Sequence, residues 1–163
     1  WRMIPLKLAI VSVAAVVIQL TLFVEVRIAG VAPELLAMLG VLLAFYAGIE
    51  RGPILAFAAG LLWDIYLPTP LGVAAVTFAI VAFSVASLEE GLFHDSVAQL
   101  TVIVGLGSVA SVVGYALIGE VVGQRGLIDV EMLRVAAIVG LINAALTPLL
   151  APVVRWALVE GRR

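Results

Sequence analysis

The chain has 163 residues, of which 64% are hydrophobic and only 12% are charged, and its formal net charge is −2. An average soluble domain is about half apolar and about a quarter charged, so this chain lacks the polar residues that a soluble surface needs. The composition therefore predicts an integral membrane protein, and its fifteen glycines agree, because glycine is frequent in membrane helices. The slightly negative charge argues against a nucleic-acid partner, and the absence of cysteine excludes disulfides and thiolate chemistry.

Six apolar windows approach the roughly 20 residues that a helix needs to cross a bilayer, once tilt is allowed. We expect spans at about residues 5–26, 34–49, 53–67, 71–88, 97–122 and 131–158, packed as a compact all-α bundle that makes residues 1–163 one polytopic domain. Residues 50–53 and Pro68-Thr69-Pro70 are predicted to break the chain on either side of the third span. The first window exceeds the apolar region of a signal peptide and is predicted to remain in the membrane. Since the chain starts at Trp1, its true N-terminus is expected upstream.

The distribution of basic residues predicts that both termini are cytoplasmic. With that orientation the inner segments hold Arg2, Lys7, Arg51, Arg155, Arg162 and Arg163, and the outer segments hold Arg27, Arg125 and Arg134. An excess of Lys and Arg marks the cytoplasmic side. Asp64 and the following turn are then expected at the outer face.

Small residues recur at helical spacing in five of the six windows. Gly52, Ala56 and Gly60 precede Asp64 at intervals of four, which places all four on one helix face. Similar stripes are Gly40, Ala44 and Gly48; Ala75, Ala79, Ala82 and Ala86; Gly107 with Ser111 and Ala110 with Gly114; and Ala136, Gly140 and Ala144. Such stripes let membrane helices pack closely. The first window has the weakest stripe and is expected at the periphery.

Asp64 is the strongest candidate among the polar residues, because ionisable groups inside membranes are costly. The favoured interpretation is structural: its carboxylate accepts hydrogen bonds from the amides that begin the next helix after the Pro-Thr-Pro turn. A contact with a partner or ligand comes second, and proton transfer third. Trp63 and Tyr66 are interpreted as interface anchors.

Other polar residues are assigned supporting roles. Gln19 and Asn143 lie in mid-span and are predicted to form hydrogen bonds across helices. Pro148 and Pro152 predict a kink in the last span. Glu120 and the His94-Asp95 pair are interpreted as solvated residues.

No enzymatic motif is present in the sequence. It lacks a Gly-x-Ser-x-Gly elbow, a phosphate-binding Walker loop and a His-Glu-x-x-His helix. The single histidine and the lack of cysteine make a metal centre implausible. We therefore expect neither catalysis nor a cofactor.

Three motifs resemble the rod shape-determining protein MreD family. They are Pro33-Glu34-Leu35-Leu36, Arg51-Gly52-Pro53, and Gly60-Leu61-Leu62-Trp63-Asp64 followed by Pro68-Thr69-Pro70-Leu71-Gly72. The resemblance in motif covers about residues 33–86, and the other spans agree only in hydropathy. The family usually has Pro-Asp where this chain has Pro33-Glu34, so Glu34 is a conservative departure.

The resemblance implies a non-enzymatic role in the bacterial cytoplasmic membrane. Members of the family associate with MreC, a single-span protein, and through it with MreB, RodA and a class B penicillin-binding protein. A fold similar to the substrate-binding subunits of energy-coupling-factor transporters is also implied. The implied mechanism is a scaffold for cell elongation and peptidoglycan synthesis that offers a lipid-facing groove to MreC. Pro33, Glu34, Gly60, Asp64, Pro70 and Gly72 carry over as motif positions with structural roles.

The main alternative is a substrate-binding subunit of a vitamin-type transporter. Its outer pocket would require aromatic and polar groups that converge. Trp63, Asp64 and Tyr66 could begin such a pocket, but the outer loops add no further aromatic residue. An ion or solute channel is a third hypothesis, and the sequence gives it little support, because no ring of charges is visible.

Overall fold

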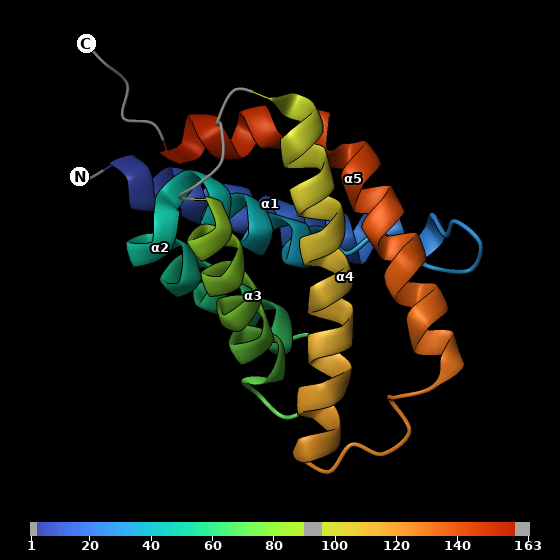
Figure 1. The fold of residues 1–163 in the computed structure, drawn as a ribbon. Helices are drawn as coiled ribbons and strands as arrows, with labels where there is room; N and C mark the ends of the chain where they lie inside the picture. Colours follow the sequence, from blue (N-terminus) through green and yellow to red (C-terminus); the bar gives the residue numbers. More distant parts are fainter. Residues whose placement is uncertain (1–2, 90–95, 159–163) are drawn as a thin grey trace.

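The computed structural model describes residues 3–89 and 96–158, in which the chain forms five helices (Figure 1). These are α1 (Met3–Glu25), α2 (Leu35–Asp64), α3 (Val73–Glu89), α4 (Val97–Val121) and α5 (Val130–Leu158). Helices α1, α2, α4 and α5 are the four candidate membrane spans by total length and composition, although α2 is interrupted at Gly48, and α3 is a shorter apolar helix. The all-helical membrane class is confirmed. His94 and Asp95 lie outside the described residues.

The predicted count of six membrane-crossing helices is not supported, because the second and third windows belong to the single element α2. This element is interrupted at Gly48, which has φ 71° and ψ −177°. That conformation is essentially restricted to glycine. The predicted break at residues 50–53 is therefore misplaced: Glu50 and Arg51 are helical, and Pro53 lies inside a helix.

The two arms of α2 lie side by side as a hairpin. A Cβ atom added at Gly40 would lie 3.6 Å from the Ala56 Cβ, and one added at Gly52 would lie 2.7 Å from the Ala44 Cα. Residues this far apart in sequence can meet only if the chain reverses at Gly48. The first arm rises about 20 Å at about 1.5 Å per residue, which is short of the roughly 30 Å hydrocarbon core. Length therefore argues against counting this arm as an independent span.

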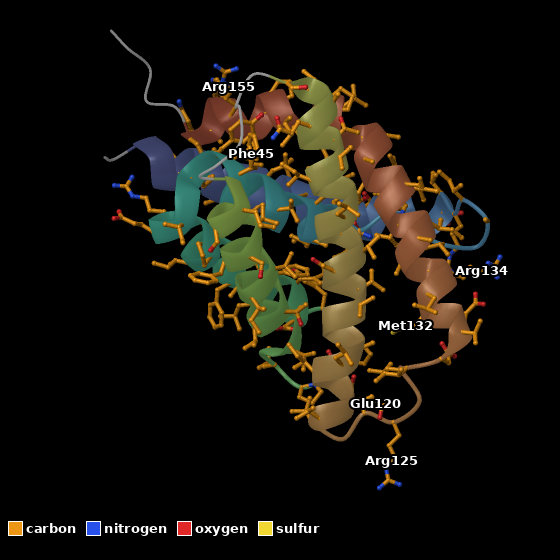
Figure 2. All side chains as sticks on the ribbon, in the orientation of Figure 1. Phe45, Glu120, Arg125, Met132, Arg134 and Arg155 are labelled. Carbon is orange, nitrogen blue, oxygen red and sulfur yellow. The ribbon has the colours of Figure 1, made fainter. Side chains whose placement is uncertain are left out.

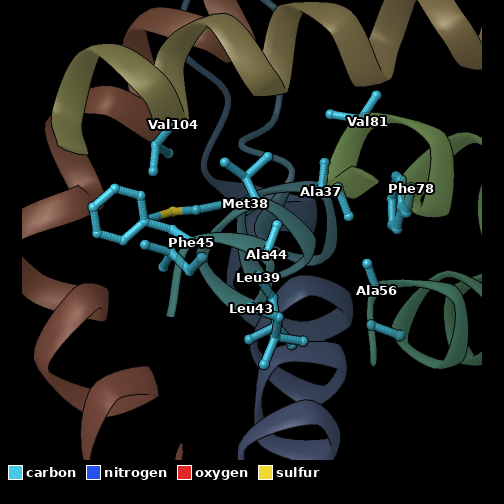
Figure 3. Packing of buried hydrophobic residues seen from close by; sticks show 14 of the residues in the cluster. Ala37, Met38, Leu39, Leu43, Ala44, Phe45, Ala56, Phe78, Val81 and Val104 are labelled. Atoms are coloured by element: carbon cyan, nitrogen blue, oxygen red, sulfur yellow. The ribbon is translucent and has the colours of Figure 1, made fainter. Parts of the chain in front are cut away.

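The first arm of α2 forms the centre of the molecule. Every residue from Leu35 to Phe45 is buried. Figure 3 shows the Met38 side chain extending towards the Phe45 ring, with Val104 of α4 on the same side. On the other side of the cluster, Phe78 of α3 lies near Ala56. A helix that is apolar and buried all round is a core element, and the other helices pack around it.

Small residues hold α2, α3, α4 and α5 in close contact. A Cβ at Gly60 would lie 2.6 Å from the Ala75 Cα, so α3 crosses directly over this glycine. Between α4 and α5, a Cβ at Gly105 would lie 3.3 Å from both the Ala144 Cβ and the Gly140 carbonyl oxygen. These contacts are what small residues provide in membranes, where close van der Waals packing stabilises helix association.

Helix α1 lies at the edge and is the least buried of the four candidate spans, as expected from its weak stripe. Gln19 fixes it to the bundle: its Nε2 donates to the Pro33 carbonyl at 2.7 Å, and its Oε1 accepts from the Leu35 amide at 2.8 Å. Figure 1 shows that α5 bends along its length, and Pro148 and Pro152 lie inside this helix. The predictions for Gln19 and for the kink are confirmed.

Candidate functional site

Asp64 organises the turn between α2 and α3. Its carboxylate accepts hydrogen bonds from three backbone amides: Gly72 at 2.9 Å, Ala74 at 3.0 Å and Ala75 at 3.1 Å. The side chain is buried, with 1% of its surface exposed. A carboxylate at the start of a helix satisfies amides that have no partner within the helix and interacts favourably with the helix dipole. Asp64 is therefore the cap of α3, as the structural interpretation expected.

The remaining motif residues support this turn, which we call the Asp64 turn (residues 64–75). Gly72 has φ 106°, a conformation that favours glycine, and it brings its amide to the carboxylate. From α4, the Tyr115 hydroxyl donates to Thr69 Oγ1 at 2.9 Å, so the Pro-Thr-Pro segment is tied to a third helix. Tyr66 is exposed on this turn. Pro70 is exposed within this turn.

A cavity of about 410 Å³ lies beside the Asp64 turn. It is lined by Gln19, residues 30–34, Trp63, Leu67, Val112, Tyr115, Val135 and Val139. Trp63 and Tyr115 place two aromatic rings at this cavity, and Tyr115 is the aromatic residue that the sequence argument missed. It lies in α4, far from the outer loops in sequence, so only the fold brings it here.

Glu34 lines the same cavity and precedes α2, with no capping hydrogen bond from its side chain. Burial raises the pKa of the Glu34 carboxyl from 4.5 to about 7, because an apolar environment disfavours the charged form. Its backbone carbonyl accepts from the Met38 amide and from Asn143 Nδ2. The position thus combines a helix start with a carboxyl that titrates near neutrality.

Asn143 links three elements. Its Nδ2 donates to the Glu34 carbonyl at 3.1 Å and to Ser108 Oγ at 2.9 Å, which joins α5 to α4 and to the start of α2. The Asn143 Oδ1 atom is buried without a hydrogen-bond partner among the described residues. The predicted bonding of Asn143 across helices is confirmed, and its partner Ser108 is a residue that the sequence could not identify.

A second feature, the α3–α4 groove, lies along the surface between these two helices. It has a volume of about 590 Å³ and runs from Thr77 to Leu88 on α3 and from Ile103 to Ile118 on α4. Its hydroxyls bond to their own helix: Thr77 donates to the Val73 carbonyl and Ser84 to the Ile80 carbonyl. The lining is otherwise apolar. Ala110 is exposed in this groove, whereas Gly114 packs against α3, because a Cβ added there would lie 3.1 Å from Thr77 Cγ2. A second helix could approach closely at Ala110.

The structure places the predicted motif residues at the Asp64 turn and at the neighbouring cavity, and the predicted packing residues within the helices. Gly60, Asp64, Pro70 and Gly72 come together at the Asp64 turn. Pro33 and Glu34 line the neighbouring cavity, where Pro33 is buried and accepts from Gln19. The packing residues Gly40, Ala44, Gly52 and Ala56 lie within the α2 hairpin around Gly48, and Ala136, Gly140 and Ala144 lie on α5, with Gly140 and Ala144 facing α4.

Glu120 has a role that the sequence argument did not find. Its Oε1 accepts from the Gly126 amide at 2.7 Å and the Leu127 amide at 2.9 Å, which fixes the loop before α5. Among the described residues, no group of three or more His, Cys, Asp or Glu side chains could hold a metal ion.

The fold and these regions define a helical multi-pass membrane protein in which a deeply buried carboxylate, that of Asp64, caps a helix. The chain matches the rod shape-determining protein MreD family over residues 2–156, and it belongs to that family. The match extends the motif resemblance at residues 33–86 to nearly the whole chain.

Two further comparisons complete this picture. The chain is 32% identical over 120 residues to the Na⁺/H⁺ antiporter NhaA of Frankia casuarinae; the aligned part is 72% of this chain and 26% of that protein. The chain thus spans about a quarter of the length of this curated relative. No solved structure matches the chain, so the expected similarity to energy-coupling-factor substrate-binding subunits is not supported.

Proposed function

We propose that the chain is a non-enzymatic scaffold of the bacterial cell-elongation machinery, acting as one polytopic domain of the cytoplasmic membrane. Its α3–α4 groove binds the single membrane-spanning helix of MreC. Contacts with MreB, RodA and a class B penicillin-binding protein follow indirectly through MreC. Membership of the MreD family supports a role in cell elongation, and the α3–α4 groove supports the binding of a single helix.

The observation that carries the proposal is an apolar groove with small residues between two exposed ridges. Ile80 on α3 is 55% exposed and Leu106 on α4 is 66% exposed, while Ala110 and Gly114 line the space beside them. Apolar surface alone gives no drive for association in lipid, because acyl chains are equally apolar. Shape complementarity at small residues does, and this favours a helix over a lipid chain as the occupant.

Ala110→Trp tests this proposal, because it fills the groove from an exposed position. We expect recovery of MreC with the tagged chain, after gentle extraction from native membranes, to fall about tenfold or more, since overpacking costs roughly 1–3 kcal/mol. The matched control is Ala145→Trp, at an exposed alanine of α5. Both variants should keep the parent melting temperature.

Retention of MreC by Ala110→Trp, or equal loss in both variants, would contradict the assignment of the groove. Recovery of transporter ATPases with a coupling subunit, in place of MreC, would support the vitamin-type transporter alternative, which the family membership does not favour. The activity of the antiporter relative is not carried over, because the chain spans only a quarter of that protein.

A further inference from the structure

A basic pocket lies at the opposite end of the molecule from the Asp64 turn. It has a volume of about 530 Å³ and receives residues from four helices: Lys7 from α1, Tyr46 from α2, Val97 and Leu100 from α4, and Arg155 with Trp156 from α5. The bend of α5 after Pro148 brings the last turns of this helix to the start of α1 (Figure 1). Two cations from the two ends of the chain therefore share one cavity.

Among the described residues, no carboxylate is paired with the two cations of this pocket. Lys7 Nζ lies 4.7 Å from the centroid of the Trp156 ring, a cation–π contact that leaves the positive charge in place. Within residues 3–89 and 96–158, neither Lys7 nor Arg155 forms an ion pair with a carboxylate. Two like charges at one cavity repel each other, and an anion between them would relieve that repulsion.

The rest of the lining indicates what kind of anion fits. Val97, Leu100 and Ala151 form an apolar wall, and Tyr46 and Trp156 are the aromatic types found where a membrane meets water. A cavity that is cationic at one side and apolar at the other matches an amphiphile with a phosphate. Basic pockets between membrane helices commonly bind anionic lipid head groups.

We propose that this pocket binds one anionic phospholipid, of the phosphatidylglycerol or cardiolipin class. Its phosphodiester lies between Lys7 and Arg155, and its glycerol and upper acyl chain lie against Val97 and Leu100. The lipid joins α1 to the end of α5, two helices at the edge of the bundle. The proposal does not depend on what occupies the α3–α4 groove.

The test uses the purified full chain, stripped of lipid in detergent. Binding is followed by native mass spectrometry and by the shift in melting temperature with phosphatidylglycerol, cardiolipin, phosphatidylcholine or inorganic phosphate. We expect the two anionic lipids to bind and stabilise, and phosphatidylcholine and inorganic phosphate to have little effect. Stabilisation by inorganic phosphate equal to that by lipid would overturn the lipid assignment in favour of a free anion.

Two sets of variants make the test specific to the pocket. Lys7→Gln with Arg155→Gln should weaken phosphatidylglycerol binding about 30-fold, since each basic residue near the membrane surface contributes about 1 kcal/mol. The control, Arg27→Gln with Arg125→Gln, removes the same charge from exposed positions outside the pocket. Equal loss in both pairs would reduce the effect to net charge and overturn the proposal.

Val97→Trp provides a variant that keeps both cations. Val97 is 63% exposed, so the larger ring should be tolerated by the fold while filling the apolar side of the pocket. We expect weaker phosphatidylglycerol binding with an unchanged melting temperature in the absence of lipid. Unchanged lipid binding in this variant would show that the cations act without the cavity, contrary to the proposal.

Discussion

Asp64 shows how a charged side chain is tolerated in a chain this apolar. Its two carboxylate oxygens accept hydrogen bonds from three backbone amides. Buried polar groups in proteins are nearly always hydrogen-bonded in this way. The residue therefore stabilises the α2–α3 connection.

Asp64→Ala should strongly destabilise the chain, because it leaves three amides without their acceptor. We expect a loss of at least about 2 kcal/mol, measured by thermal unfolding in detergent. The matched control is Asp129→Ala, which also removes a helix cap. The Asp129 carboxylate accepts one exposed hydrogen bond, from the Met132 amide at 2.7 Å. The control should lose only about 1 kcal/mol. Equal losses would refute the special role of Asp64.

Glu34 should make the stability depend on pH. Its pKa in the folded chain, about 7, lies above the ordinary value of 4.5. Between these values the folded state holds a proton that the unfolded state has released, so stability falls as pH rises from about 4.5 to about 7 and then levels off. Melting temperatures of the parent and of Glu34→Gln across this range should converge at low pH and separate as pH rises. Glu25→Gln, an exposed control, should have the same pH dependence of the melting temperature as the parent. If Glu34→Gln also had the parent's pH dependence, burial of Glu34 would not be the cause.

At the scale of elements, close backbone contacts decide the packing. Gly60 lies under the first turn of α3, where the Ala74 carbonyl oxygen and the Ala75 Cα would meet any added carbon. Backbone atoms cannot rotate away as a flexible side chain can. This contact fixes the crossing of α2 and α3 at the Asp64 turn.

Gly60→Leu should therefore disrupt the bundle. A Cβ alone would lie 2.6 Å from the Ala75 Cα, so the helices must separate, at a cost of about 1–3 kcal/mol or more. The expected result is a lower melting temperature and failure to support rod growth. Ala58→Leu, on the exposed side of the same helix, should behave like the parent. If Gly60→Leu also assembled normally, close packing at this crossing would be the wrong explanation.

The elements show which parts of the fold are local in origin. Hydropathy identified the helices, and an acid before a Pro-Thr-Pro turn and a glycine identified the cap of α3. The break in α2 was misplaced because Pro53 and the charged pair before it looked like the boundary. The actual break depends on the backbone angles of Gly48, and one glycine among fifteen carries no signal of its own.

The candidate sites depend on contacts that no local pattern specifies. Glu34, Trp63 and Tyr115 meet at one cavity although Glu34 precedes α2, Trp63 lies near the end of α2 and Tyr115 lies in α4. Asn143 could be expected to bond across helices, but its choice of Ser108 and the Glu34 carbonyl follows from how α5 crosses the bundle. The groove was likewise unpredictable, because it forms only where α3 and α4 pack side by side.

At the scale of the whole molecule, the two ends have different character. Figure 2 shows Arg155 at one end and Arg125 at the other. Lys7 and Trp156 touch, so the start of α1 and the end of α5 lie on the same side. The basic pocket at that side agrees with the excess of Lys and Arg expected in the cytoplasm.

Fusion reporters should place this side in the cytoplasm. A fluorescent protein at the C-terminus should be bright, and alkaline phosphatase inserted after Gly123, in the loop before α5, should be active. Phosphatase inserted at Glu50, next to the hairpin turn of α2, should be inactive. The opposite pattern would invert the proposed orientation, and activity at both insertions would contradict the hairpin.

The buried first arm of α2 also has a consequence for biosynthesis. A ribosome synthesises this arm long before it makes α4 and α5. In the folded chain, however, Val41 packs against Gly107 of α4, and the Glu34 carbonyl accepts a hydrogen bond from Asn143 of α5. The nascent hairpin therefore lacks its contacts with α4 and α5 at first, and it reaches its final packing only when these helices have been translated. Ribosome stalling before α5 should leave a protease-sensitive intermediate, and a chain truncated there should be a substrate for membrane quality control.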